Sequence, residues 1–288
     1  MIVIYLVIVI MRLSGISIFF QATEILFGMA KDKHDFDRSL FRLTGFFINP
    51  NWAGVFLSWS LAYFLFNFRR KNFQRLLLIS IIFILVLLTG SRTGLVCSFL
   101  VLFFWLFIEG KARYILMIVL SALLLISIIG IETFISFFPF HYRELLEALI
   151  VTGSISEVAT FSERIDWWKE VFNKTVLDSI IFGSGPFKEN IGVMFENQYL
   201  KWLAWYGFFG VLLMLLYYLY FVITSADLII KGDNERAVNF SKSLIAMIFS
   251  ISIAGMTGAF FDVTQLLILL FAQFGFILSI SNKKLYKN

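Results

Sequence analysis

Four charged side chains in this sequence have the types needed to bind a phosphate group and to activate a hydroxyl group. Arg42, Arg92 and Arg164 are the cations, and Glu196 follows them as the carboxylate. A guanidinium is planar, stays protonated and bonds two phosphate oxygens at once, whereas a carboxylate can act as a general base. These residues predict a site for a phosphate-bearing lipid. From spacing alone, helix capping and anchoring to phospholipid headgroups also explain them.

The sequence lacks the motifs that several other kinds of chemistry need. The chain has no HExxH, no GxxxxGK[ST] loop and no GxGxxG after a strand, and its two histidines are His34 and His141. Its single cysteine, Cys97, permits neither a disulfide within the chain nor a CxxC metal site. Asp35 and Asp37 form a DxD pair that can hold a divalent cation, although a solvated charged loop is the commoner explanation of such a pair. No metal and no cofactor is predicted.

Helices that span a membrane must position the charged residues. Hydrophobic residues make up 60% of the chain and charged residues 15%, and the mean hydropathy is +0.88. Soluble domains are about half apolar and about a quarter charged, so a bilayer is needed to bury the excess. The apolar runs fall at 2–20, 50–68, 76–90, 94–108, 114–137, 199–223, 243–260 and 263–280. The sequence therefore predicts an all-α integral membrane protein with about eight transmembrane helices in a single polytopic domain, 1–288.

The distribution of charge predicts the orientation of these helices. The short connections and the C-terminal tail together carry twelve basic and four acidic residues, whereas the long connection at 138–198 carries five basic and nine acidic ones. Basic connections stay in the cytoplasm. Both termini are therefore predicted to be cytoplasmic, and the long connections, 21–49 and 138–198, to be extracytoplasmic. The three arginines and the glutamate then all lie at the outer face.

The large extracytoplasmic loop, 138–198, is predicted to be structured and helical. Ser154 with Glu157, and Thr160 with Glu163, are capping-box pairs that start helices. The second pair precedes ERIDWWKEVFNK, whose apolar residues repeat at helical spacing, so an amphipathic helix near the membrane surface is expected. The FGSGP that follows breaks any helix.

Five motifs occur in an order that resembles one family of membrane enzymes. They are FRLTGFFINPNWAG, LTGSRTG, SERIDWW, FGSGP and ENQYLKWLAWYGFFG, and they cover about residues 35–215. Their order and their depth relative to the apolar runs resemble the O-antigen ligase and Wzy-type polysaccharide polymerase family. Family members carry several more spans before the NPN motif, so the chain resembles a short or N-terminally truncated member.

The resemblance implies a GT-C-like glycosyltransferase of the bacterial cytoplasmic (inner) membrane. Such an enzyme transfers a glycan from undecaprenyl pyrophosphate to an acceptor sugar hydroxyl at the outer face, without a nucleotide sugar, metal or other cofactor. By resemblance, Arg92 and Arg164 are catalytic residues that bind the donor pyrophosphate, with Arg42 as a third candidate. Glu196, followed by Asn197, occupies the place of the His-Asn pair of the ligases, whose histidine is the proposed base. This departure favours a polymerase over a lipopolysaccharide ligase.

The resemblance assigns further residues to substrate binding. Asn51, Trp168, Asn197 and Tyr199 join Arg42 in this group. Trp168 and Tyr199 are expected to stack on sugar rings or, alternatively, to anchor the chain in the membrane interface. The implied partners are the lipid-linked oligosaccharide, the lipid bilayer and other polysaccharide-assembly membrane proteins, with no nucleic acid among them.

Three other functions fit part of the pattern. They are an O-antigen-type ligase that uses another acceptor, a flippase or transporter of the lipid-linked glycan, and a membrane scaffold without enzymatic activity. Transporters tend to show internal repeats and interrupted helices with a polar site at the membrane midplane. Here the ionisable residues lie at helix ends and in one outer loop, which favours chemistry at one face. Whether the product is a capsule, an exopolysaccharide or an O-antigen stays open.

Overall fold

The structure is a computed structural model that describes residues 47, 49–68, 72–110, 113, 131–136, 140–148, 159–173, 179–185, 197–232, 234–258 and 264–285. Every regular element within those ranges is a helix, which confirms the all-α prediction for that part of the chain. The chain divides into two compact units, Met1–Val119 and Leu120–Asn288. The predicted span at 2–20 and most of the one at 114–137 lie outside the described residues.

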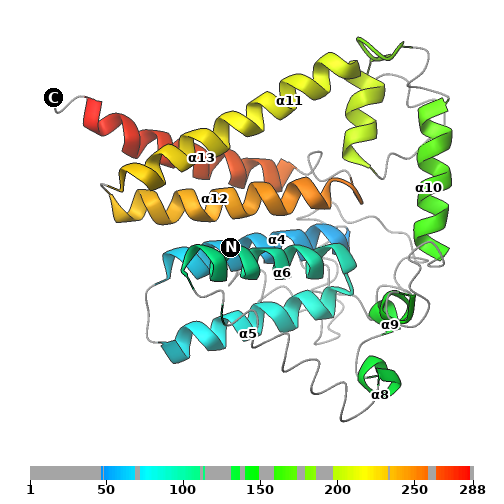
Figure 1. Ribbon diagram of the computed structural model, residues 1–288, viewed down its shortest axis with the longest axis horizontal. Coiled ribbons are helices and arrows are strands. Elements are labelled where there is room, and N and C mark those ends of the chain that lie inside the picture. Colours follow the sequence, from blue (N-terminus) through cyan, green and yellow to red (C-terminus); the bar gives the residue numbers. More distant parts are fainter. Residues whose placement is uncertain are drawn as a thin grey trace, which may run out of the picture. The chain divides into compact units, whose positions relative to one another are not determined.

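Three helices of the first unit coincide with three predicted spans. They are α4 (Pro50–Asn67), α5 (Asn72–Thr89) and α6 (Arg92–Ile108), drawn in blue to blue-green in Figure 1. Asn49 caps α4, and the proline that follows suits the first helical position because no N–H is needed there. The start of the predicted span at 50–68 is therefore confirmed.

A contact between two glycines holds α4 against α6. A Cβ atom added to Gly94 would lie 2.5 Å from the Cα of Gly54, so the two backbones touch. Small residues of this kind let membrane helices approach closely. Further along the same pair, the rings of Phe66 and Phe104 meet with centroids 6.3 Å apart. Because both contacts follow the same chain direction, α4 and α6 run parallel and their N-termini lie at the same end of the unit.

Arg75 ties the three helices together at the opposite end of the first unit. This residue belongs to α5, and its Nη2 donates a hydrogen bond to the carbonyl of Leu65 in α4. Its guanidinium carbon lies 4.7 Å from the ring centroid of Trp105 in α6. A cation over an indole ring is attracted by the negative face of the π system. One side chain thus contacts both neighbouring helices.

Six described helices belong to the second unit. α8 (Ile131–Ser136) lies within the predicted span at 114–137, and α9 (Phe140–Glu147) and α10 (Ala159–Val171) lie in the 138–198 connection. They are followed by α11 (Gln198–Lys231), α12 (Glu235–Ala254) and α13 (Thr264–Leu285). The position of α10 confirms the helix predicted within that connection. The last three helices coincide with the last three predicted spans, and α12 packs against both α11 and α13 (Figure 1).

A break near its start divides α11 into two pieces. Gly207 has φ 66° and ψ −169°, a conformation that essentially only glycine adopts, so the helix consists of 198–206 and 208–231. Figure 1 shows the two pieces meeting at a sharp angle. The longer piece exposes large apolar side chains, including Phe208 and Leu213 at 60% and 65%. A helix that is apolar around its circumference requires an apolar environment.

Two described helices, α11 and α12, are long and apolar enough to cross a membrane, and shorter apolar helices occur within α5, α6 and α13. Length and composition thus indicate a membrane protein. The count of eight spans, the GT-C-like arrangement and the single polytopic domain stay predictions.

Candidate functional site

The turn between α5 and α6 places Arg92. Ser91 caps α6, and its Oγ accepts a hydrogen bond from the Gly94 N–H at 2.9 Å. The Thr89 hydroxyl donates to the Val86 carbonyl at 2.6 Å and accepts from the Ser91 N–H at 3.1 Å. Thr89 and Ser91 are fully buried, whereas Arg92, the first residue of α6, is partly exposed. A buried, hydrogen-bonded turn therefore fixes the start of α6 and, with it, the position of Arg92.

The start of α4 lies beside this turn. Asn49 caps the helix by accepting a hydrogen bond from the Asn51 N–H at 2.8 Å, and Asn51 itself is partly exposed. A Cβ atom on Gly54 would lie 2.9 Å from the Ser91 side chain, so the first turns of α4 and α6 are in contact. Each helix N-terminus carries roughly half a positive charge. Together with Arg92, they give this end of the unit a positive potential that favours an anion.

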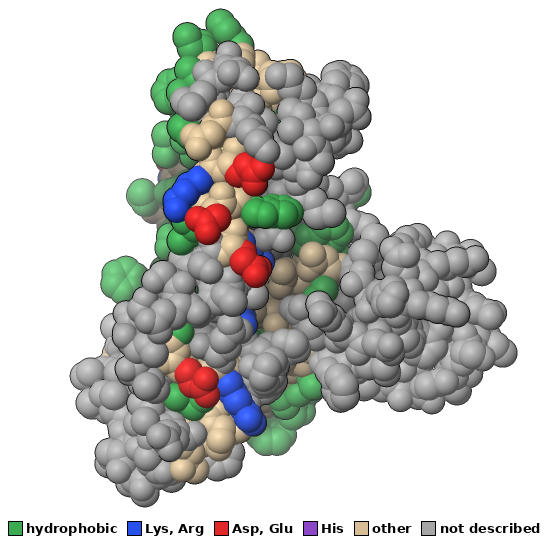
Figure 2. All heavy atoms as spheres, turned by 90° about the vertical axis from the view of Figure 1, so that its right-hand side faces the viewer, with side chains coloured by type: hydrophobic (Ala, Val, Ile, Leu, Met, Phe, Trp, Pro, Cys, Tyr) green, Lys and Arg blue, Asp and Glu red, His purple; other side chains and the backbone are tan. Residues whose placement is uncertain are grey.

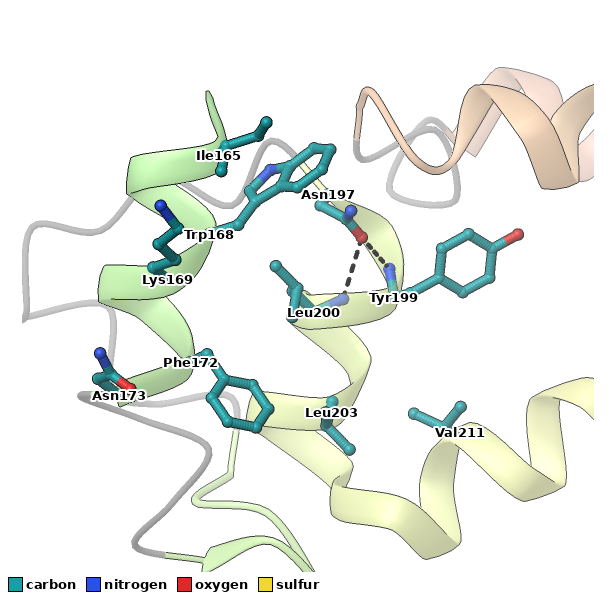
Figure 3. A pocket seen from close by; sticks show the side chains of 10 residues that line it. All are labelled: Ile165, Trp168, Lys169, Phe172, Asn173, Asn197, Tyr199, Leu200, Leu203 and Val211. Atoms are coloured by element: carbon teal, nitrogen blue, oxygen red, sulfur yellow. Dashed lines mark hydrogen bonds between the residues drawn. The ribbon is translucent and has the colours of Figure 1, made fainter. Parts of the chain in front are cut away.

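A cavity of about 600 Å³ lies between α10 and the start of α11 in the second unit. Figure 3 shows its lining, which consists of Ile165, Trp168, Lys169, Phe172, Asn173, Asn197, Tyr199, Leu200, Leu203 and Val211. Most of these side chains are apolar, and the Lys169 ammonium pairs with the Asp166 carboxylate at 3.1 Å. Such a lining suits a hydrocarbon chain or the apolar face of a sugar ring better than a set of hydroxyl groups.

Hydrogen bonds hold Asn197 at the edge of this cavity. Its Oδ1 accepts from the N–H groups of Tyr199 and Leu200 at 2.9 and 3.1 Å, the bonds drawn as dashed lines in Figure 3. Its Nδ2 donates to the carbonyl of Met256 at 3.2 Å. The amide therefore caps α11 and attaches the start of that helix to the turn that follows α12. In the described structure Asn197 has an anchoring role.

Tyr199 and Gln198 strengthen the same attachment. The Tyr199 hydroxyl donates to the carbonyl of Ser252 at 2.5 Å, and the Gln198 N–H donates to the carbonyl of Gly255 at 2.8 Å. In Figure 3 the Tyr199 ring points away from α10. Stacking of this ring on a sugar stays a prediction, while its hydroxyl is engaged with α12.

Arg164 and two tryptophans lie on α10. Arg164 is partly exposed, Trp168 lines the cavity, and Trp167 is 44% exposed. Figure 2 shows acidic side chains interleaved with basic ones on the face of the second unit that α10 helps to form. Glu163 and Asp166 are among the exposed acids. The helix thus presents one apolar side to α11 and a charged side outward, as an amphipathic helix should.

The candidate residues predicted from the sequence fall into two groups. Those in the first unit are Arg92 and Asn51, and those in the second are Arg164, Trp168, Asn197 and Tyr199. Arg42 and Glu196 lie outside the described residues. Their assigned roles, and the convergence of the two groups on one substrate, stay predictions. Within the described ranges, no three histidine, cysteine, aspartate or glutamate side chains gather to hold a metal ion.

One feature next to the site was not predicted from the sequence. FGSGP was expected only to break a helix, whereas the turn at 179–185 is joined to the break in α11 by backbone hydrogen bonds. Glycine-containing motifs mark both the turn and the break in the sequence, but nothing within either motif indicates that the two are in contact.

The fold and these residues define a helical membrane protein with polar groups gathered at helix starts and in one structured connection. Residues 76–215 match the family model described as O-antigen ligase. This match, over just under half of the chain, confirms the resemblance to the O-antigen ligase/Wzy-type family seen in the motifs. The family indicates glycosyl transfer of the ligase or polymerase type, with a lipid-linked polysaccharide substrate in a membrane. No curated protein and no solved structure matched the chain.

Proposed function

We propose that this protein is a polysaccharide polymerase of the bacterial cytoplasmic membrane, with about eight spans and both termini in the cytoplasm. It transfers a glycan from undecaprenyl pyrophosphate to a hydroxyl of an acceptor sugar at the outer face. The observation that carries the proposal is the position of Arg92. Arg92 lies within the segment that matches the O-antigen ligase family, and it is the first residue of α6, whose N-terminus lies beside that of the parallel helix α4.

The reaction is a single displacement at the anomeric carbon of the donor. Glu196 accepts the proton of the acceptor hydroxyl, and the hydroxyl oxygen forms a bond to that carbon. The bond from the carbon to the pyrophosphate oxygen breaks, and undecaprenyl pyrophosphate leaves with the electron pair. Arg92 and Arg164 stabilise the charge that develops on the leaving group, and Arg42 is a third phosphate ligand. Attack from the opposite face inverts the anomeric centre.

The neighbouring residues bind the glycan and hold the base. Asn51 adjoins the turn that carries Arg92. Trp168 offers an aromatic surface in a cavity whose lining suits the apolar face of a sugar. Asn197 directly follows Glu196, and its hydrogen bonds to α11 and to Met256 restrain the backbone next to the base. Tyr199 adds a second restraint through its hydroxyl.

The test replaces single arginines in cells whose polymer depends on this chain. Removing one donor that stabilises transition-state charge lowers the rate about 10²–10³-fold, so Arg92→Ala should abolish polymer at equal membrane abundance. Arg92→Lys keeps the positive charge but loses the paired N–H donors that bond two phosphate oxygens at once, so it should give shortened polymer. Arg143→Ala is the control, because Arg143 lies in the 138–198 connection and donates to the Ser136 carbonyl at 2.7 Å. It should leave the polymer unchanged.

The products distinguish the proposed function from its rivals. In a strain without the chain, a polymerase leaves exported single repeat units that are not joined. A ligase leaves finished polymer without its acceptor, and a flippase leaves repeat units in the cytoplasm; either result overturns the proposal. Normal polymer length in Arg92→Ala overturns the role of the arginine.

A further inference from the structure

The turn at 179–185 completes the start of the longer piece of α11. The N–H of Phe208 donates to the carbonyl of Ile180 at 2.8 Å, and the N–H of Phe209 donates to the carbonyl of Ile181 at 3.3 Å. The first N–H groups of a helix have no partner within the helix. The turn supplies two of those partners and therefore acts as a cap made of backbone.

The same turn closes the end of the shorter piece, 198–206. The N–H and hydroxyl groups of Ser184 both donate to the carbonyl of Ala204, at 2.8 and 3.0 Å. The N–H of Gly185 donates to the carbonyl of Trp205 at 3.0 Å. The last carbonyl groups of a helix also lack partners within the helix. We call the turn, the break and the hydrogen bonds between them the loop–helix junction.

Two glycines make the close approach at the junction possible. A Cβ atom on Gly183 would lie 2.4 Å from the carbonyl carbon and oxygen of Trp205, and one on Gly207 would lie 2.3 Å from the Ile181 oxygen. Both glycines have positive φ, 72° and 66°. The opposing atoms belong to the backbone, so no change of rotamer can relieve the clash. Any larger residue must separate the turn from α11.

The shorter piece of α11 is held at both of its ends. At its start, Asn197 and Tyr199 bond to carbonyls at the end of α12. At its end, the junction holds the carbonyls of Ala204 and Trp205. A short helix restrained at two points has one direction, and Glu196 directly precedes it in the sequence. The junction therefore controls the direction of the element that follows the proposed base.

We infer that Gly183, Ser184 and Gly207 are positioning residues for glycosyl transfer. They act through the direction of the shorter piece of α11, and so on the proposed base that directly precedes it in the sequence. This inference rests on the proposed function. Because the junction contributes to the geometry of the reacting groups, its loss lowers the turnover number and leaves KM for the donor unchanged.

Gly183→Ala and Gly110→Ala form a matched pair for the test. Both positions have positive φ, 72° and 66°, so alanine strains the backbone in both variants. Gly110 lies outside the junction and a Cβ there has nothing within 4 Å, whereas one on Gly183 meets the backbone of α11. The chain in nanodiscs is assayed with lipid-linked repeat units extracted from cells that lack it. Gly183→Ala should lose about tenfold or more in turnover, since a misplacement of ~1 Å costs up to about a hundredfold, and Gly110→Ala should stay near wild type.

A second pair of variants perturbs the junction less and tests the inference even if Gly183→Ala fails to fold. Ser184→Ala removes only the hydroxyl bond to Ala204 and keeps the backbone bond. We expect a loss of about threefold in turnover, the size associated with one hydrogen bond. Ser184→Thr retains a hydroxyl and should restore the rate. A merely structural role would change the yield of folded protein and not the turnover of the folded fraction.

Amide hydrogen exchange reports on the junction independently of activity. The segments 179–185 and 204–209 should lose protection together in Gly183→Ala and keep it in Gly110→Ala. Wild-type turnover with this protection lost, an equal fall in both alanine variants, or a rise in KM alone overturns the inference. If a strain without the chain makes finished polymer or holds its repeat units in the cytoplasm, the proposed function fails instead, whatever the junction variants show.

Discussion

Replacing Gly94 by alanine is expected to displace Arg92 without removing it. The new Cβ atom would lie 2.5 Å from the Cα of Gly54 and 2.8 Å from its carbonyl carbon. Non-bonded carbon atoms pack at about 3.5–4.0 Å, so α6 must move away from α4 by about 1 Å at this contact. Arg92 lies two residues before Gly94 in the same helix and moves with it.

The displacement should reduce activity far more than stability. A shift of about 1 Å in a group that positions the substrate costs up to about a hundredfold in rate. Overpacking of a well-packed contact costs about 1–3 kcal/mol. We therefore expect Gly94→Ala to insert in the membrane with a modestly lowered melting temperature and to make little or no polymer.

Polymer length per unit of membrane-inserted protein is the assay, with thermal unfolding in detergent as the second measurement. Gly275→Ala is the matched control, because Gly275 lies in α13, its φ is not positive, and an added Cβ has nothing within 4 Å. Alanine in place of an unconstrained helical glycine stabilises by roughly 0.5–1 kcal/mol, so polymer should be normal. Wild-type polymer from well-inserted Gly94→Ala would refute the reasoning, and so would an equal loss in Gly275→Ala.

Two further predictions concern side chains that join helices. Tyr199→Phe removes the hydroxyl that donates to Ser252. It should lower the free energy of unfolding by about 1 kcal/mol, measured by thermal unfolding, and should keep most of the polymer. A loss of polymer as large as in Tyr199→Ala would mean that the hydroxyl is needed for activity. Arg75→Met keeps the apolar stem but removes the cation over Trp105 and the bond to Leu65. It should cost about 1–2 kcal/mol by the same measurement, and an unchanged melting temperature would contradict this.

Helix starts were predictable because their signals are local. Asn49 and Pro50 define the start of α4 within three residues of sequence. Ser91 does the same for α6, and the apolar repeat of ERIDWWKEVFNK identified α10. In each case the residues that form the cap or the face are neighbours along the chain, so propensity and spacing are sufficient.

Contacts between distant segments were not predictable in the same way. The sequence analysis does not show that Gly94 meets Gly54, that Gly183 meets Gly207, or that the Tyr199 hydroxyl reaches α12. The break in α11 is hidden because aromatic residues continue the apolar run on both sides of the glycine. Asn197 was assigned to substrate binding from its place in a motif, whereas its hydrogen bonds show a helix cap.

Because the loop–helix junction is built mainly from backbone groups, it restricts the identity of few residues. Of the hydrogen bonds described across it, the one from the Ser184 hydroxyl comes from a side chain, and the others join main-chain N–H and carbonyl groups that every non-proline residue carries. Phe182 also stacks on Phe209 across the junction, with ring centroids 5.6 Å apart. The junction requires glycine at Gly183 and Gly207, where a side chain would meet opposing backbone atoms. Its geometry therefore depends on two residue identities and on a backbone conformation, so substitutions at neighbouring positions should change it little wherever the chain keeps that conformation.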